Sequence, residues 1–88
     1  MITVRVPLGA RAYDVIVGHG ARAELGALLP KSARRAAIVT QSGIPLAVDP
    51  GLPCERFEIG HGEEHKTLST IERLCRGFAG MSLTRDDV

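Results

Sequence analysis

The apolar run within residues 35–40 limits the fold of this chain more than any other feature of its sequence. The residues from Ala36 to Val39 follow one another without a polar interruption. A short run of this kind is typical of a strand that is buried on both faces, as in a parallel sheet covered by helices. Aromatic residues make up only 3% of the chain, so aliphatic side chains have to fill the core, which suits the same architecture. The sequence therefore predicts an α/β fold.

Two segments that alternate apolar and polar residues precede this strand. They are residues 2–6 and 13–17, separated by a turn at 7–11, and they predict an antiparallel hairpin. The next segment, residues 21–29, is expected to form a helix with its leucines on one face, and Pro30 is expected to end it.

The second half of the chain predicts a strand, a loop and a helix. Residues 54–59 are expected to form a short strand near a sheet edge, after a proline-rich connection that disfavours a long helix. The helix is expected over residues 67–80, with either Thr67 or Ser69 as its cap. The helix prediction rests on apolar residues at three- and four-residue steps, namely Leu68, Ile71, Leu74, Cys75, Phe78 and Ala79.

Residues 83–88 resemble the approach to one more strand. A βαβ unit closes only when the returning strand pairs into the sheet, and this crossover is expected to lack that return. We therefore expect residues 1–88 to be the N-terminal part of a larger α/β domain, with an incomplete Rossmann-like parallel sheet and an N-terminal antiparallel hairpin.

Charge and cysteine content exclude several functional classes. The formal net charge of +1 gives no reason to expect nucleic acid or an anionic membrane as a partner. No apolar segment approaches the roughly 18–20 residues that a membrane helix needs. Cys54 and Cys75 fit no metal or redox spacing, and both are expected to be reduced, partly buried thiols in a cytoplasmic protein.

Two motifs have a functional and a structural interpretation. Residues 18–23 match G-x-G-x-x-A, the dinucleotide fingerprint, but no acidic residue stands about 20 residues further on, where Gln41 lies. The glycines are better explained by a tight turn. His61 and His65 superficially resemble a zinc motif, yet Gly62 occupies the position of its general base, so we predict no metal ligands in this chain.

The polar loop at residues 60–66 is the strongest candidate for a binding site. A loop between a strand and a helix lies at the ligand-facing edge of an open α/β sheet. The carboxylate of Glu63 is able to accept hydrogen bonds from a ribose diol, and Lys66 is able to bind phosphate or to orient that carboxylate. Gly62 lets the backbone approach a ligand closely. These residues predict a contact with a nucleotide.

The segment from Ile59 to Leu68 resembles the G-E-x-x-K-[ST] signature of the 3-dehydroquinate synthase family. The order of the other expected elements also fits that family, in which the next element is a strand leading to a triple-glycine turn with an aspartate. The resemblance covers nearly the whole chain. It implies an N-terminal NAD-binding domain, and a C-terminal metal-binding catalytic domain that is absent from these 88 residues.

The resemblance implies a lyase of the shikimate pathway for the full-length parent. Such an enzyme converts the sugar phosphate 3-deoxy-D-arabino-heptulosonate 7-phosphate to 3-dehydroquinate and phosphate, with NAD and a divalent metal, zinc or cobalt. It would be cytoplasmic and homodimeric, and these 88 residues alone would be inactive. The implied NAD contacts are Gln41, His61, Gly62, Glu63, Glu64, His65 and Lys66, with Thr40 as a weaker candidate. No catalytic residue is implied before Val88.

Two departures from the family leave the exact substrate open. The connection from Ile44 to Pro53 is short and rich in proline where the family has a helix, and His61 stands where the family has an acidic residue. The alternatives are a related sugar-phosphate cyclase, an NAD-dependent and metal-containing polyol or glycerol dehydrogenase, and a non-catalytic nucleotide-binding module.

Overall fold

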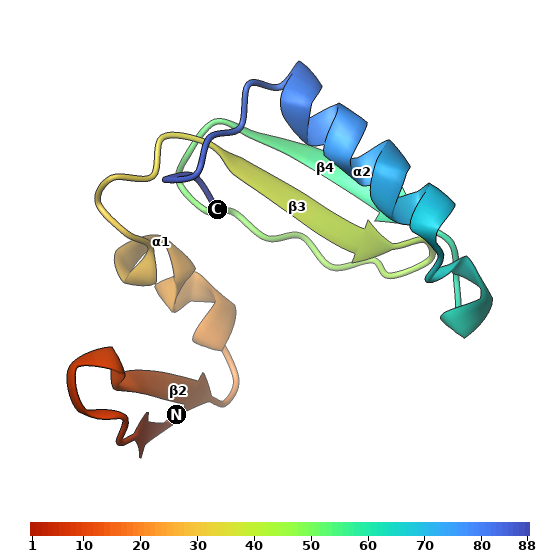
Figure 1. Cartoon of the computed structure of the whole chain (residues 1–88). Coiled ribbons are helices and arrows are strands. Elements are labelled where there is room, and N and C mark those ends of the chain that lie inside the picture. Colours follow the sequence, from red (N-terminus) through yellow and green to blue (C-terminus); the bar gives the residue numbers. More distant parts are fainter.

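The N-terminal segments form the predicted hairpin. A computed structural model describes residues 1–88, and in it strand β1 (Ile2–Val6) pairs antiparallel with strand β2 (Tyr13–Val17). A single 3-10 turn, η1 (Gly9–Arg11), lies in the connection. The register places Ile2 opposite Val17, so aliphatic side chains share one face of the hairpin. Figure 1 shows this hairpin apart from the second sheet.

The helix predicted over residues 21–29 is shorter and tighter than expected. A 3-10 turn, η2 (Ala21–Glu24), leads into a single α-helical turn, α1 (Leu25–Leu28). Leu29 is already extended, with ψ 148°. Proline disfavours the helical conformation of the residue before it, so Pro30 ends the helix one residue earlier than predicted.

The second sheet consists of two parallel strands. Strand β3 (Ala36–Gln41) and strand β4 (Cys54–Ile59) pair in parallel, which confirms both predicted strands. Strand β3 begins and ends one residue later than the predicted range of 35–40. The proline-rich connection between them contains no helix or strand, which confirms that no long helix forms there. The α/β class and the hairpin are therefore confirmed, while the Rossmann-like character of the complete sheet stays a prediction.

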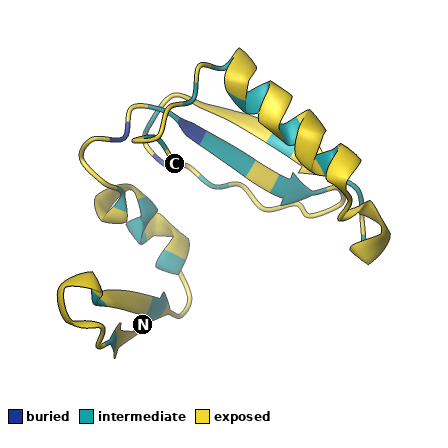
Figure 2. Cartoon of the chain, viewed as in Figure 1, coloured by how far each residue is buried: buried dark blue, intermediate teal, exposed yellow.

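Strand β3 is not buried on both faces, which corrects the expectation from its apolar run. Only three residues are buried, Ala33, Ala36 and Pro50, no large side chain is fully buried, and Val39 is 45% exposed. Figure 2 shows burial concentrated at the start of β3. The radius of gyration is 15.0 Å, compared with about 12 Å for a compact domain of this length. One helix beside a two-stranded sheet leaves much of the sheet uncovered.

The long helix α2 (Leu68–Gly80) has well-defined ends. The Thr67 hydroxyl accepts a hydrogen bond from the Thr70 N–H at 3.3 Å, so Thr67 is the cap and the alternative cap, Ser69, is wrong. At the other end Ser82 adopts φ 59°, the only positive φ outside glycine. The Leu83 N–H donates to the Phe78 carbonyl at 3.0 Å, which is the Schellman arrangement.

Helix α2 packs on β4 through an aromatic contact. The rings of Phe57 and Phe78 meet edge to face, with centroids 5.3 Å apart. Gly77 allows the helix to approach, because a Cβ atom there would lie 2.3 Å from the Phe57 ring. The Arg73 guanidinium also donates to the Glu58 carbonyl at 3.0 Å. These contacts hold the helix beside the strand that leads into the polar loop.

Both cysteines are exposed, which corrects the expectation of partly buried thiols. Cys75 belongs to the apolar stripe of α2, but it is exposed, as are Leu68 and Ile71 of the same stripe. Cys54 is the first residue of an edge strand.

The C-terminal residue lies beside the free edge of β3. The Val88 N–H donates to the Arg35 carbonyl at 3.2 Å, and the Ala37 N–H donates to the Val88 carbonyl at 2.8 Å. This is the hydrogen-bond pattern of parallel pairing. Val88 thus pairs beside β3, on the side opposite β4, as expected if residues 83–88 approach a further strand; the sheet itself contains only β3 and β4. None of the helices has the length and apolar character needed to cross a bilayer.

Candidate functional site

The ends of β3 and β4 bring two of the predicted site residues together. The parallel register places Gln41 opposite Ile59, so the two strands end level with each other. The Gln41 side-chain amide contacts the Nδ1 atom of His61, which follows β4 by two residues. In addition, the Ser42 N–H donates to the Ile59 carbonyl at 2.9 Å. Residues 20 positions apart thus meet at the carboxyl edge of the sheet, where open α/β folds bind ligands.

The backbone of the polar loop depends on Gly62. This residue has φ 92° and ψ 171°, a conformation that side chains disfavour. It precedes a single 3-10 turn, η3 (Glu63–His65), in which the Lys66 N–H donates to the Glu63 carbonyl at 3.0 Å. The turn keeps the four side chains after Gly62 exposed to solvent.

Glu63 and Lys66 form the closest ion pair of the loop. The Lys66 ammonium lies 2.6 Å from one carboxylate oxygen of Glu63, although both side chains are largely exposed. An exposed pair of this kind contributes little to stability, about 0.2–1 kcal/mol. Its value lies in orientation, because it fixes one oxygen of Glu63 and leaves the second free to accept a hydrogen bond.

Glu64 and His65 belong to the same turn, and both are exposed. The His65 Nε2 atom lies 4.0 Å from a Glu64 oxygen. The His65 ring packs over Gly60 so closely that a Cβ atom there would lie 2.2 Å from it. Thr40 pairs in register with Glu58, and no side-chain hydrogen bond connects it to the loop. Within the predicted set, Gln41 and His61 contact each other across the two strands, and the other loop residues follow His61 in the chain.

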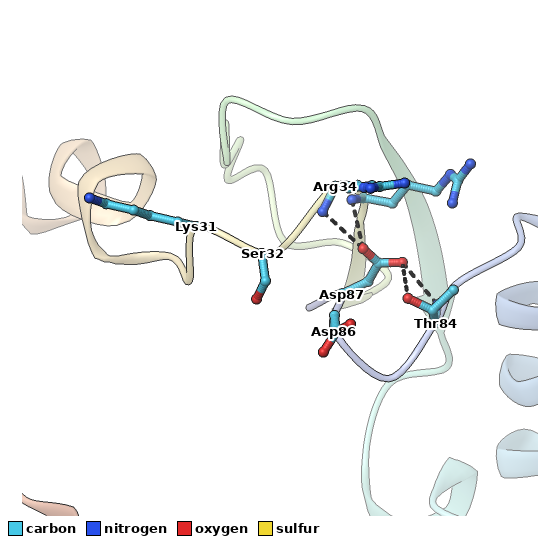
Figure 3. A pocket seen from close by; sticks show the side chains of 7 residues that line it. Lys31, Ser32, Arg34, Thr84, Asp86 and Asp87 are labelled. Atoms are coloured by element: carbon cyan, nitrogen blue, oxygen red, sulfur yellow. Dashed lines mark hydrogen bonds between the residues drawn. The ribbon is translucent and has the colours of Figure 1, made fainter.

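The site is an exposed edge rather than a cavity. None of the three cavities in the structure is lined by the predicted nucleotide contacts. The cavity with the most polar lining lies at the amino end of β3, far along the strand from Gln41. Figure 3 shows its charged and hydroxyl side chains, which are those of Lys31, Ser32, Arg34, Arg35, Thr84, Asp86 and Asp87.

Asp87 organises that opposite end of the sheet. Its carboxylate accepts hydrogen bonds from the backbone N–H groups of Arg34 at 2.9 Å, Arg35 at 3.1 Å and Thr84 at 2.9 Å. These bonds, led by those from Thr84 and Arg34, lower the pKa of Asp87 to about 2. The sequence analysis missed this residue, although the spacing of Thr84 and Asp87 is that of a local side-chain turn. Its contacts are structural, because they hold the last turn of the chain against the start of β3.

The two other motifs have structural explanations. Strand β2 pairs with β1 in a hairpin, so Gly18 and Gly20 do not follow the first strand of a βαβ unit. Gly20 has φ 78°, as the tight turn requires, and a Cβ atom on Gly18 would lie 2.9 Å from Met1. No group of three or more metal-ligating side chains comes together in residues 1–88, including around His61 and His65.

Comparison with known proteins identifies relatives along almost the whole chain. A protein of Amycolatopsis mediterranei, provisionally named aminodehydroquinate synthase, is 40% identical over 87 residues, which cover 98% of this chain and 25% of the relative. A 3-dehydroquinate synthase of Rhizobium etli is 46% identical over 84 residues, covering 83% of this chain and 22% of the relative. A 3-dehydroquinate synthase of Bradyrhizobium diazoefficiens is 29% identical over 98 residues, which cover 99% of this chain and 26% of the relative.

The chain spans about a quarter of the length of the curated relatives it matches. No protein-family model matches the chain, and no solved structure matches it. The resemblance seen in the signature at residues 59–68 is confirmed by these relatives.

Proposed function

Because the chain is similar over nearly its whole length to proteins named 3-dehydroquinate synthase, we propose that it forms the NAD-binding portion of an enzyme of this type. The reaction of that enzyme would eliminate phosphate from 3-deoxy-D-arabino-heptulosonate 7-phosphate and close the ring of 3-dehydroquinate. The homologues' name supports a lyase as the activity of the longer protein.

One observation supports the cofactor site more than any other. Gln41 and His61, which leave two different strands, touch at the carboxyl edge of the parallel pair, and the signature loop continues from there. A dinucleotide lying across this edge would meet side chains from both strands, as it does in other open α/β sheets. The donor set also fits such a ligand, since it combines amide, imidazole and ammonium N–H groups with one oriented carboxylate.

Five residues at this edge have a definite role in this proposal. Lys66 holds the Glu63 carboxylate, whose free oxygen accepts a hydrogen bond from a ribose hydroxyl. Gly62 removes the side chain that would keep the ligand from the backbone. His61 and Gln41 hold each other in place and supply further polar contacts.

NAD, when bound, supplies transient hydride transfer, so that the substrate is oxidised and later reduced within one cycle. The residues of this chain bind and orient that cofactor.

A second candidate follows from the Amycolatopsis relative. Its provisional name, aminodehydroquinate synthase, designates a related product that carries an amino group, and it is similar to 98% of this chain. The cofactor loop would serve both reactions equally. Assaying the longer protein with each substrate, under identical NAD concentrations, distinguishes the two by the ratio of kcat/KM values.

Two experiments test the proposed function. The encoding gene, read past the codon for Val88, should continue into a strand and a glycine-rich turn with an aspartate; a reading frame that ends there would favour a small binding protein instead.

In the longer protein, Glu63→Ala should raise the Kd for NAD about tenfold or more, as expected from losing a charge-assisted hydrogen bond worth ~1.5–3 kcal/mol. Glu55→Ala, a matched loss of charge at the other end of β4, should leave the Kd unchanged.

A further inference from the structure

The hairpin of β1 and β2 carries a concentrated apolar surface. Seven of the fourteen large apolar residues that are exposed lie within residues 1–17, a short part of the chain. The antiparallel register gathers most of them on one face, because directly opposed residues point to the same side of a sheet. The pairs on this apolar face are Ile2 with Val17, Val4 with Val15, and Val6 with Tyr13.

The other face of the hairpin is different in character. Thr3 pairs with Ile16 there, and Arg5 pairs with Asp14, with the guanidinium 3.0 Å from the carboxylate. Charge is thus confined to one side of the hairpin, and the apolar face carries none. A sheet with one polar and one apolar face normally packs its apolar face on another layer.

No helix or strand of the chain supplies that layer. Figure 1 shows the hairpin at one end of the molecule, joined to the second sheet through η2 and α1, and Figure 2 shows it almost wholly exposed. An isolated two-stranded hairpin is only marginally stable in water, so a second layer would stabilise it. The large side chains of the apolar face that are 40–67% exposed are Ile2, Val4, Tyr13, Val15 and Val17.

The apolar face has the area that a second copy of the chain would need. At these exposures it presents roughly 500 Å² of apolar surface, within the size range of patches that mark interaction sites. Two such faces packed on each other remove about 1,000 Å² from water, which is the lower limit for a specific interface. Because the face bears no charge, it is complementary to itself across a twofold axis. A partner that is recognised by its charge finds no counter-charge on it.

We propose that two copies of this chain associate through the apolar faces of their hairpins, packed face to face around a twofold axis. The central pair, Val4 and Val15, lies in the middle of this two-layer interface, and Tyr13 lies toward its end. Pairing through the strand edges would leave the apolar face uncovered, so the faces rather than the edges form the contact. Because the buried area is at the lower limit, the dimer dissociates in the micromolar range.

Sedimentation equilibrium of the chain measures this association. A reductant is present, because Cys54 and Cys75 are exposed and would otherwise be able to form disulfides between copies. A monomer–dimer equilibrium with a micromolar Kd is expected. A chain that stays monomeric up to nearly millimolar concentration overturns the proposal, and leaves the apolar face to be covered by another segment of a longer protein.

NMR of a mixture of isotope-labelled and unlabelled chain locates the interface. Intermolecular NOEs should connect the methyl groups of Val4, Val15 and Val17. If the chain dimerises but the NOEs arise instead from the exposed residues of α2, Leu68 and Ile71, the proposed interface is wrong.

Two substitutions at adjacent positions of β1 separate the apolar face from net charge. Val4→Asp and Thr3→Asp add the same charge on opposite faces of the hairpin. Val4→Asp should raise the dimer Kd about hundredfold or more, because the twofold axis places two unpaired carboxylates in the interface. Thr3→Asp should change the Kd little, and an equal effect of the two variants contradicts the proposal.

A milder variant answers the question if Val4→Asp unfolds the hairpin. Val15→Thr keeps a β-branched side chain that favours a strand, and it places only a hydroxyl in the interface. It should raise the dimer Kd about tenfold, because each copy buries one hydroxyl without a partner. An unchanged Kd for Val15→Thr would remove the centre of the apolar face from the interface and refute the proposal.

Discussion

Replacing Gly77 by alanine tests how α2 is held on the sheet beside the proposed site. An alanine normally stabilises a helix interior by about 1 kcal/mol relative to glycine. Here the new methyl group would lie 2.3 Å from the Phe57 ring, which cannot move without disturbing its edge-to-face contact with Phe78. Overpacking costs ~1–3 kcal/mol, and the aromatic contact contributes ~0.5–1.5 kcal/mol. We expect Gly77→Ala to lower the free energy of unfolding by about 1–2 kcal/mol.

Gly80→Ala is the matched control in the same helix. No atom lies within 4 Å of a Cβ at that position, and its φ is not positive. The substitution should therefore stabilise the chain, by about 0.5 kcal/mol at a helix end. Both changes are measured by unfolding in urea, followed by circular dichroism. An osmolyte is present in every sample, because it strengthens burial and so stabilises the folded state.

The two glycines should thus respond with opposite signs. If Gly77→Ala stabilises the chain as much as Gly80→Ala does, the packing of α2 against Phe57 is not as described. A double-mutant cycle adds a second check, because Phe57→Leu removes the ring that the new methyl group meets. The double variant, Phe57→Leu with Gly77→Ala, should be about 1 kcal/mol more stable than the value obtained by adding the two single changes in the free energy of unfolding.

Substitutions at three further positions test the ends of α2 and the last turn. Because the pKa of Asp87 is lowered from 3.8 to about 2, its stabilising effect is present above pH 3.8 and is lost as the pH falls through about 2. Asp87→Asn should flatten this part of the pH–stability curve in acid unfolding. Ser82→Gly should raise the melting temperature, because its φ of 59° strains a side chain, whereas Ser82→Ala should not. Thr67→Ala should lower the free energy of unfolding by about 1 kcal/mol in the same urea assay, because it removes the helix cap.

Local sequence pattern was sufficient for the elements whose boundaries depend on their own residues. The alternation at residues 2–6 and 13–17 predicted both hairpin strands to the residue. The periodicity of α2 predicted its length to within one residue, because its apolar stripe and its caps are encoded locally. The signature loop was also placed correctly between β4 and α2, since a change of periodicity marks each of its ends.

Pattern failed where the outcome depended on neighbours. The run from Ala36 to Val39 predicted burial on both faces, but burial requires covering layers, and a single helix beside two strands cannot supply them. Cys75 followed the apolar period of α2 and is nevertheless exposed, because the sheet contacts only part of that stripe. The helix near residue 25 was overestimated for a local reason, the effect of Pro30 on the residue before it.

The sequence by itself determined the hairpin, the strands β3 and β4, the helix α2, and the loop with Glu63 and Lys66. Each of these follows from residues close together in the chain. Only the tertiary structure decided that Gln41 meets His61 and that Asp87 reaches the start of β3. These contacts join residues 20 and more than 50 positions apart. Such pairs form through strand register and chain reversal, which no local pattern specifies.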